Sequence, residues 1–223
     1  MSKTILVVVA HADDEALGCG GTMARHAAAG DQVYVVFVAD GVTSRVVAGD
    51  EELALRQQAT ARACTILGVT SSTFLGLPDN QLDSIPLLDI VQPLEGICAK
   101  LAPEVIYTHH YGDLNVDHRV THQAVMTACR PLPGAAVREI LTFEVMSSTE
   151  WASVGLAPFL PNLFVDISAQ LEIKMRALEA YALEMRAIPH SRSLAHAQCL
   201  AQHHGNCVGV DAAEAFMLMR AVR

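Results

Sequence analysis

The chain has 223 residues with a formal net charge of −9, and 52% of its residues are hydrophobic while 17% are charged. This composition excludes intrinsic disorder and predicts a globular protein with a sizeable core. The 15 Lys and Arg residues are scattered, which excludes a groove for nucleic acid. No apolar run reaches the roughly 18 to 20 residues of a membrane span, and no signal-peptide pattern follows Met1, so we expect a cytoplasmic protein without a membrane span.

Strand-like and helix-like segments alternate along the first part of the chain. Apolar, β-branched runs bounded by turn residues predict buried parallel strands at residues 5–10, 33–39, 73–75 and 105–108, and two further strands are expected at 139–145 and 163–167. Helices are expected at residues 17–29, 51–67, 87–101 and 118–129. The alternation predicts an α/β fold, namely a Rossmann-like, mostly parallel sheet with helices on both faces.

The C-terminal third is predicted to be helical. Ser168 can cap a helix that runs to about residue 186, Pro189 breaks it, and a second helix follows at about residues 193–203. These Ala- and Met-rich helices are interpreted as core or as a surface for homo-oligomer contacts. No repeat or linker interrupts the chain, so residues 1–223 are expected to form one domain.

Six cysteines are widely spaced and include no CxxC pair. In a cytosolic chain of this length such cysteines are typical of free thiols in the core.

A cluster of titratable residues follows the first predicted strand, at His11-Ala12-Asp13-Asp14-Glu15. Ligands of open α/β sheets bind at the carboxyl ends of the strands. An imidazole and a carboxylate three residues apart can hold one divalent ion, while the carboxylate between them stays free to act on a bound water. The alternative explanation is a helix N-terminus, where the helix dipole favours acidic residues.

A second cluster, His109-His110-Tyr111-Gly112-Asp113-Leu114-Asn115-Val116-Asp117-His118-Arg119, follows the strand at 105–108. Burying the His and Asp side chains of both loops at one edge of a sheet would cost free energy if they had no partners, and a shared metal ion would offset that cost. The pair of clusters therefore favours a metal site.

The sequence resembles the zinc-dependent de-N-acetylases of the PIG-L/LmbE type, whose first motif is A-H-P-D-D-E and whose second contains D-H-R. The corresponding segments are Ala10-His11-Ala12-Asp13-Asp14-Glu15 and Asn115-Val116-Asp117-His118-Arg119. Further likeness lies in the loop at residues 74–79 and in the segment 209–216, so the resemblance covers most of the chain.

The resemblance implies that His11, Asp14 and His118 bind Zn²⁺ and that Asp13 is the general base. Two imidazoles and one carboxylate suit a catalytic zinc that keeps a position open for water. The zinc would lower the pKa of that water, and Asp13 would take its proton as it attacks an N-acetyl carbonyl. Glu15 is interpreted as a supporting or helix N-terminal residue rather than a ligand.

Two positions depart from the family pattern. Ala12 replaces the proline of the first motif and leaves every donor atom in place. Asn115 stands where many relatives carry a histidine that protonates the leaving amine or supports the transition state. An amide can hydrogen-bond an oxyanion but cannot deliver a proton, so Asp13 must also act as the acid, or a C-terminal histidine must. His190 is the first candidate for this acid; alternatively, His190 is only a solvent-exposed residue of a loop.

Other candidate site residues have weaker support. Asp117 is interpreted as an orienting carboxylate for a site histidine, as the N-cap of the following helix, or as both. Arg56 lies where relatives often place an arginine that meets the substrate, but it equally fits a solvated helix position. Asp79 at the rim, His110 and Arg192 are the remaining candidates for substrate binding.

The predicted function is hydrolysis of an N-acetyl group from a small-molecule amino sugar or glycoconjugate of the N-acetylglucosamine type. The alternatives are a metal-bound carbohydrate-recognition module without turnover, suggested by Asn115, and a Rossmann-type nucleotide-dependent transferase, suggested by the fold. The glycines at 18, 20 and 21 lack the G-x-G-x-x-G spacing of a dinucleotide site. Specificity is expected to lie in loops such as 41–49 and 147–161.

Overall fold

The computed structural model describes residues 2–41 and 50–223, with backbone only at 50–53. The strands are β1 (Thr4–Val9), β2 (Gln32–Ala39), β3 (Ser71–Leu77), β4 (Val105–His109), β5 (Glu139–Phe143), β6 (Leu163–Asp166) and β7 (Ala213–Ala221). The α-helices are α1 (Asp14–Ala28), α2 (Asp50–Leu67), α3 (Leu87–Leu101), α4 (Val116–Ala128), α5 (Leu171–Ala180) and α6 (Leu194–Val208), and short 3₁₀ turns are η1 (Leu82–Ser84) and η2 (Thr149–Trp151).

The strands form a seven-stranded sheet in the order β3-β2-β1-β4-β5-β7-β6. Strands β1 to β5 are parallel, while β7 is antiparallel to both of its neighbours, β5 and β6. The predicted α/β class with a Rossmann-like, mostly parallel sheet is therefore confirmed. The strand order reverses between β1 and β4, which is where ligands bind in open sheets of this kind.

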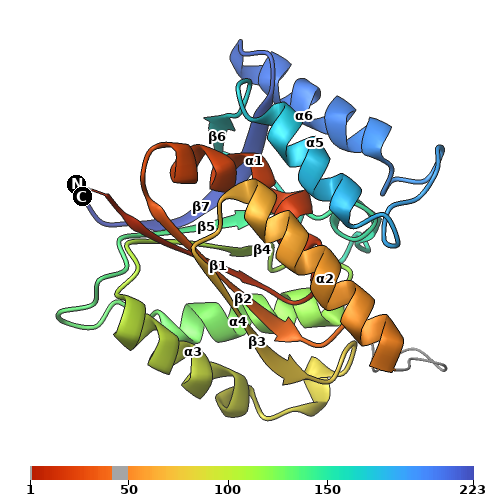
Figure 1. The fold of residues 1–223 in the computed structure, drawn as a ribbon. Coiled ribbons are helices and arrows are strands. Elements are labelled where there is room, and N and C mark those ends of the chain that lie inside the picture. Colours follow the sequence, from red (N-terminus) through yellow and green to blue (C-terminus); the bar gives the residue numbers. More distant parts are fainter. Residues whose placement is uncertain (1, 42–49) are drawn as a thin grey trace.

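The sheet is buried on both faces because successive side chains of a strand point to opposite sides. Ile5, Val7 and Val9 face one core with helices α1, α2, α5 and α6, and Leu6 and Val8 face another with α3 and α4. Figure 1 shows this arrangement, with α3 and α4 on one side of the sheet and α1, α2, α5 and α6 on the other.

The C-terminal third differs from the sequence prediction in two respects. Ser168 does not cap a long helix, because its hydroxyl donates to Asp166 Oδ1 in a turn, and α5 starts only after Gln170 and is ten residues long. The strand β7 was not predicted, since its sequence AEAFMLMRA is rich in helix-favouring Ala, Glu and Met. Pairing with two neighbouring strands outweighs that local preference.

All six cysteines are free thiols, but they do not all lie in the core. Cys19, Cys64 and Cys129 are buried, whereas Cys199 and Cys207 are exposed on α6. The expectation of core thiols is thus wrong for these last two. Within the described residues, none of the helices combines the length and apolar character needed to span a bilayer.

Candidate metal centre and catalytic site

The first cluster lies where β1 ends and α1 begins. Asp13 is the N-cap of α1 and has φ 110° and ψ −28°, in the left-handed region that a residue with a side chain rarely adopts. This turn makes Asp14 the first residue of α1, where its Oδ2 accepts a 2.8 Å hydrogen bond from the backbone N–H of His11. Such strained backbone is typical of functional sites and is retained only where the surroundings enforce it.

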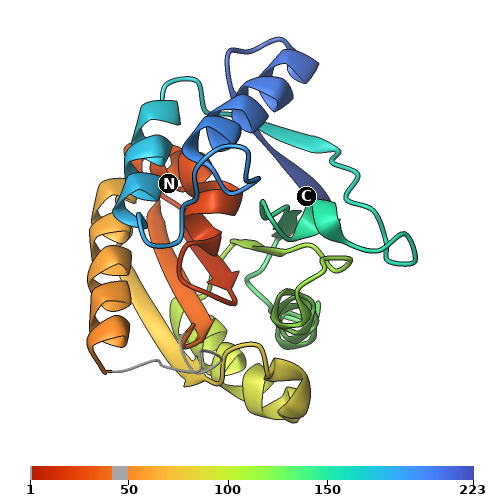
Figure 2. The same cartoon turned by 90° about the vertical axis from the view of Figure 1, so that its right-hand side faces the viewer.

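The second cluster lies where β4 ends and α4 begins, next to the first. Asn115 is the N-cap of α4, and its side-chain oxygen accepts a 2.8 Å hydrogen bond from the backbone N–H of Asp117. Asp117 therefore lies in the first turn of α4. The sequence interpretation of Asp117 as the N-cap of this helix is wrong. Figure 2 shows α4 end-on beside the loop that follows β1.

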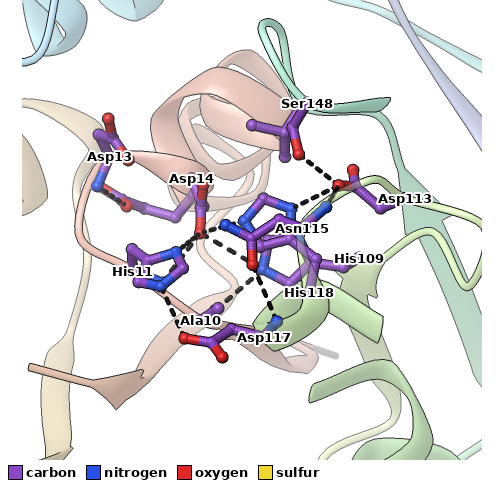
Figure 3. Close-up of polar contacts among 12 residues, drawn as sticks. Ala10, His11, Asp13, Asp14, His109, Asp113, Asn115, Asp117, His118 and Ser148 are labelled. Atoms are coloured by element: carbon purple, nitrogen blue, oxygen red, sulfur yellow. Dashed lines mark hydrogen bonds and ion pairs between the residues drawn. The ribbon is translucent and has the colours of Figure 1, made fainter. Parts of the chain in front are cut away.

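Three side chains from the two clusters bring donor atoms together. Asp14 Oδ2 lies 3.4 Å from His11 Nδ1 and 3.3 Å from His118 Nε2. One ligand atom from each of the three residues lies within 4.8 Å of the others, a spacing that allows one ion to contact all three (Figure 3). Two nitrogens and one carboxylate oxygen make up the donor set of many catalytic zinc sites.

Each of these histidines contacts a carboxylate through its other ring nitrogen. His11 Nε2 lies 3.0 Å from Asp79 Oδ1 and 3.1 Å from Asp117 Oδ2. His118 Nδ1 lies 3.2 Å from Asp113 Oδ1. A carboxylate on the far nitrogen fixes the tautomer of a ligating histidine and leaves the near nitrogen with a free lone pair.

The carboxylates that face the histidines are themselves held by the backbone and by hydroxyls. Asp117 accepts the backbone N–H groups of Asn80 at 2.7 Å and Leu82 at 3.0 Å, so it also anchors the loop after β3. Asp113 accepts the hydroxyls of Ser148 and Thr149 from the loop after β5. The two imidazoles are thus oriented by segments from three different strand ends.

Burial and charge shift the pKa values of these residues strongly. Burial raises the pKa of Asp14, but the charge of His118 and the hydrogen bonds from His11 and His118 outweigh it and hold that pKa well below its usual range. Burial lowers the pKa of His118, and the carboxylates of Asp14 and Asp113 more than compensate, so its pKa is raised to about 9. The site therefore presents concentrated negative charge that stabilises a cation.

Asp13 has a different environment from the ligand residues. Its Oδ2 accepts a 2.9 Å hydrogen bond from Arg192 Nη1, and its backbone N–H donates to Glu15 Oε2. Burial raises the pKa of Asp13 to about 6, against the opposing charge of Arg192. Glu15 is fully buried and accepts a 2.6 Å hydrogen bond from the hydroxyl of Tyr181, and burial raises its pKa to about 8. Glu15 supports the loop from behind and does not reach the donor cluster.

His109 packs directly against His118, with ring centroids 3.9 Å apart and 12° between the planes. It is fully buried, and its Nε2 accepts a 2.9 Å hydrogen bond from the backbone N–H of Ala10. Because Nε2 accepts, the ring is a neutral imidazole at this position. His109 therefore connects the ends of β1 and β4 beneath the donor cluster.

The site opens into a cavity of about 200 Å³. Of the residues predicted from the sequence, this cavity is lined by His11, Asp13, Asp14, Arg56, Asp79, Asn115, His118 and Arg192. Arg56 is buried and forms an ion pair with Glu184, so it is not a solvated helix residue.

Three predicted residues lie outside the cavity lining, namely Asp117, which faces His11 Nε2 as described above, His190 and His110. His190 is exposed, and its ring lies edge-on to Trp151 with centroids 5.7 Å apart, while its Nδ1 accepts the backbone N–H of Arg192. His110 is buried with its Nε2 2.8 Å from the carbonyl oxygen of Ala157, so it holds the loop after β5. Most of the 41–49 loop, expected to govern specificity, lies outside the described residues.

The structure gives roles to three residues that are not among the predicted site residues. Asp113 and His109 belong to the second cluster, and their position among its other His and Asp residues could have identified them from the sequence. Glu184 gave none, because it follows α5 far along the chain and was predicted to be an ordinary helix residue. Only the tertiary structure brings its carboxylate to Arg56.

Comparisons with known proteins identify what this arrangement resembles. The family described as PIG-L, GlcNAc-PI de-N-acetylase, matches residues 6–129 of the chain. An uncharacterized deacetylase YaiS of Escherichia coli is 30% identical over 80% of the chain and 90% of that protein. A 1D-myo-inositol 2-acetamido-2-deoxy-alpha-D-glucopyranoside deacetylase of Saccharomonospora viridis is 29% identical over 97% of the chain and 95% of its own length. The solved structure of the conserved protein TT1542 from Thermus thermophilus superposes with a TM-score of 0.79 at 26% identity, covering 99% of the chain and 96% of that structure.

Proposed function

The chain belongs to the PIG-L family of de-N-acetylases, and from this we propose that it hydrolyses the N-acetyl group of an amino sugar of the N-acetylglucosamine type, with Zn²⁺ as cofactor. The single observation that carries the proposal is the convergence of His11, Asp14 and His118 beside an unliganded Asp13. Two relatives are named as deacetylases of acetamido sugars, a 2-acetamido-2-deoxy-glucopyranoside of inositol and diacetylchitobiose, and these names support the substrate class.

The donor set fits zinc on the chemistry of its atoms. Two imidazole nitrogens and one carboxylate oxygen leave a position open, and each histidine has a carboxylate on its far nitrogen. His11 and His118 would bind through Nδ1 and Nε2 respectively, with Asp14 through Oδ2. When bound, the ion supplies Lewis acidity that activates water and polarises a carbonyl oxygen.

Asp13 is proposed as the proton carrier. Its carboxylate lines the cavity and is not needed for the ion, so it can accept the proton of the attacking water. Arg192 fixes the orientation of this carboxylate through Oδ2, and Arg192 is held in turn by Ser147 Oγ at 2.9 Å from its Nε. Asp13 then returns the proton to the nitrogen of the leaving amine, and acetate and a free amine result.

With Asp13 as the proton carrier, no histidine is needed at position 115 to protonate the leaving amine. The side-chain oxygen of Asn115 is engaged as the N-cap of α4, and its amide can only donate a hydrogen bond to an oxyanion. His190 lies outside the cavity lining, whereas Asp13 lies in it. We therefore propose that Asp13 serves as both base and acid.

Acetate release is the test of the proposal. The protein loaded with zinc should release acetate from N-acetylglucosamine derivatives, and Asp13→Asn should lower kcat by about 10²-fold or more, the usual contribution of acid–base catalysis. Asp89→Asn, an exposed carboxylate on α3, is the matched control and should retain activity. A carbohydrate-recognition module would bind the same sugars without releasing acetate, and a nucleotide-dependent transferase would not require the ion.

A further inference from the structure

A second cavity of about 270 Å³ lies beside the catalytic cavity, between α2 and residues 180–184. Ala12, Arg56 and Glu184 line both cavities. The two spaces are therefore adjacent, and the ion pair between Arg56 on α2 and Glu184 after α5 marks the boundary between them. A molecule bound in the catalytic cavity therefore has the second cavity directly beside it.

The walls of the second cavity combine apolar surface with a cation. Leu55, Ala59 and Arg62 occupy one face of α2, because residues four and three positions apart lie above one another on a helix. Leu183 contributes from the opposite wall. Leu55 and Leu183 are 52% and 61% exposed, so both offer apolar surface that a ligand can cover.

Arg62 is the charged group available to a ligand in this cavity. Its side chain is exposed, and within the described part of the chain no hydrogen bond or ion pair engages its guanidinium. The carboxylate of Glu184, on the same cavity, is compensated by Arg56. In a chain with a net charge of −9, an uncompensated guanidinium flanked by leucines is a favourable place for an anion.

We propose that this cavity, here called the α2 side pocket (Leu55, Ala59, Arg62 and Leu183), binds the aglycone of the substrate, and that the aglycone carries apolar surface and an acidic group. The acetamido sugar would occupy the catalytic cavity, the apolar part of the aglycone would cover the leucines, and its carboxylate or phosphate would pair with Arg62. The inference rests on the proposed deacetylase function and specifies the substrate class.

Three matched probes test the acidic group: the phenyl, 4-carboxyphenyl and 4-phosphonooxyphenyl N-acetylglucosaminides. In the zinc-loaded protein, kcat/KM for the acidic probes should exceed that for the phenyl probe by about fivefold, through a lower KM, as expected for a partly exposed ion pair. Arg62→Gln should bring the ratio to about one, and Arg62→Lys should keep most of it. A gain with the phosphonooxy probe alone would identify a phosphate as the acidic group.

The control is Lys100→Gln, which removes the same charge from an exposed position on α3 and should leave the ratio unchanged. Leu183→Ser tests the apolar part and should reduce the preference for the phenyl over the methyl glycoside by about threefold. A ratio near one in the wild type, or a ratio that survives Arg62→Gln, would overturn the proposal.

Calorimetric titration of the same probes separates this inference from the deacetylase proposal. If no probe releases acetate but the acidic probes still bind more tightly in a manner that depends on Arg62, the hydrolase proposal fails and the side pocket stands. If acetate is released and neither turnover nor binding responds to the acidic group, the side pocket fails and the hydrolase stands.

Discussion

Arg192 Nη1 donates a 2.9 Å hydrogen bond to Asp13 Oδ2 and thereby joins the segment between α5 and α6 to the loop after β1. The carboxylate is almost completely buried, whereas the guanidinium is partly exposed and also bonded to Ser147. Arg192 was expected to bind substrate. Its contact with Asp13 indicates that it also orients the proposed base.

Replacing Arg192 should affect catalysis more than binding. Arg192→Gln should lower kcat by about 10- to 100-fold with little change in KM, since it leaves a buried carboxylate without its charged partner. Arg192→Lys should restore part of kcat. Steady-state kinetics with an N-acetylglucosaminide separates the two parameters, and a rise in KM at constant kcat would instead indicate direct substrate binding.

Asp113 should govern metal affinity through His118. Asp113→Asn removes the negative charge that faces His118 Nδ1, and zinc affinity should fall by about 10- to 100-fold while the fold is retained. Competition with a chromophoric chelator measures this without any turnover. Asp89→Asn serves as the control, and equal zinc affinity in the two variants would show that Asp113 has no such role.

The buried ion pair between Lys174 and Glu214 should be important for stability. Glu214 accepts the backbone N–H groups of Gly21 and Thr22 where α1 is kinked at Cys19, and Lys174 Nζ lies 2.6 Å from it. Glu214→Gln should lower the free energy of unfolding by about 3 to 5 kcal/mol, because it leaves Lys174 buried without a counter-charge.

The exposed pair between Arg130 and Glu95 is the matched control for that measurement. Glu95→Gln should change the free energy of unfolding by less than about 1 kcal/mol. Denaturant titration of both variants at one pH makes the comparison. Similar losses in the two variants would mean that burial does not determine the contribution of the pair.

His122 should contribute to the loss of stability in acid. Burial lowers the pKa of His122 from its usual 6.5, opposed by its hydrogen bond to the carbonyl oxygen of His109. The unfolded chain therefore binds the proton more tightly, so stability is present above pH 6.5 and is lost as the pH falls. From pH 7.5 to 5.5, the free energy of unfolding of His122→Gln should fall by less than that of the wild type. The exposed His196→Gln is the control, and equal losses in all three proteins would refute the assignment.

Much of the fold could be predicted from the sequence because buried parallel strands carry a strong local signal. The bounds of α3 were predicted to the residue, and β1, β2 and β4 to within one residue at each end. β7 was missed because its residues favour a helix locally and become a strand only between β5 and β6. The helix predicted from Ser168 is too long because the hydroxyl of Ser168 hydrogen-bonds to Asp166 in a turn, and α5 begins only after that turn. This side-chain contact could not be predicted from local helix preference.

The donor cluster could be predicted because its members stand in two short segments next to strand ends. His11 and Asp14 are three residues apart, and His118 follows β4, so topology alone brings them to one edge. The roles of Asp113 and Glu184 could not be predicted, because they depend on side-chain directions and on segments that meet only in the folded chain. The assignments of catalytic and substrate-binding residues remain predictions to be tested by the variants above.

The insertion of β7 between β5 and β6 has a consequence for how the protein tolerates truncation. β6 pairs with the rest of the sheet only through β7, among the described strands, and Glu214 on β7 braces the kink of α1. Cleavage of the chain shortly before residue 213 would spare every proposed zinc ligand, yet it would remove the strand that joins β6 to the sheet and the carboxylate that binds the backbone of α1. The cleaved protein should therefore be less stable than the intact chain although its proposed ligands are all present.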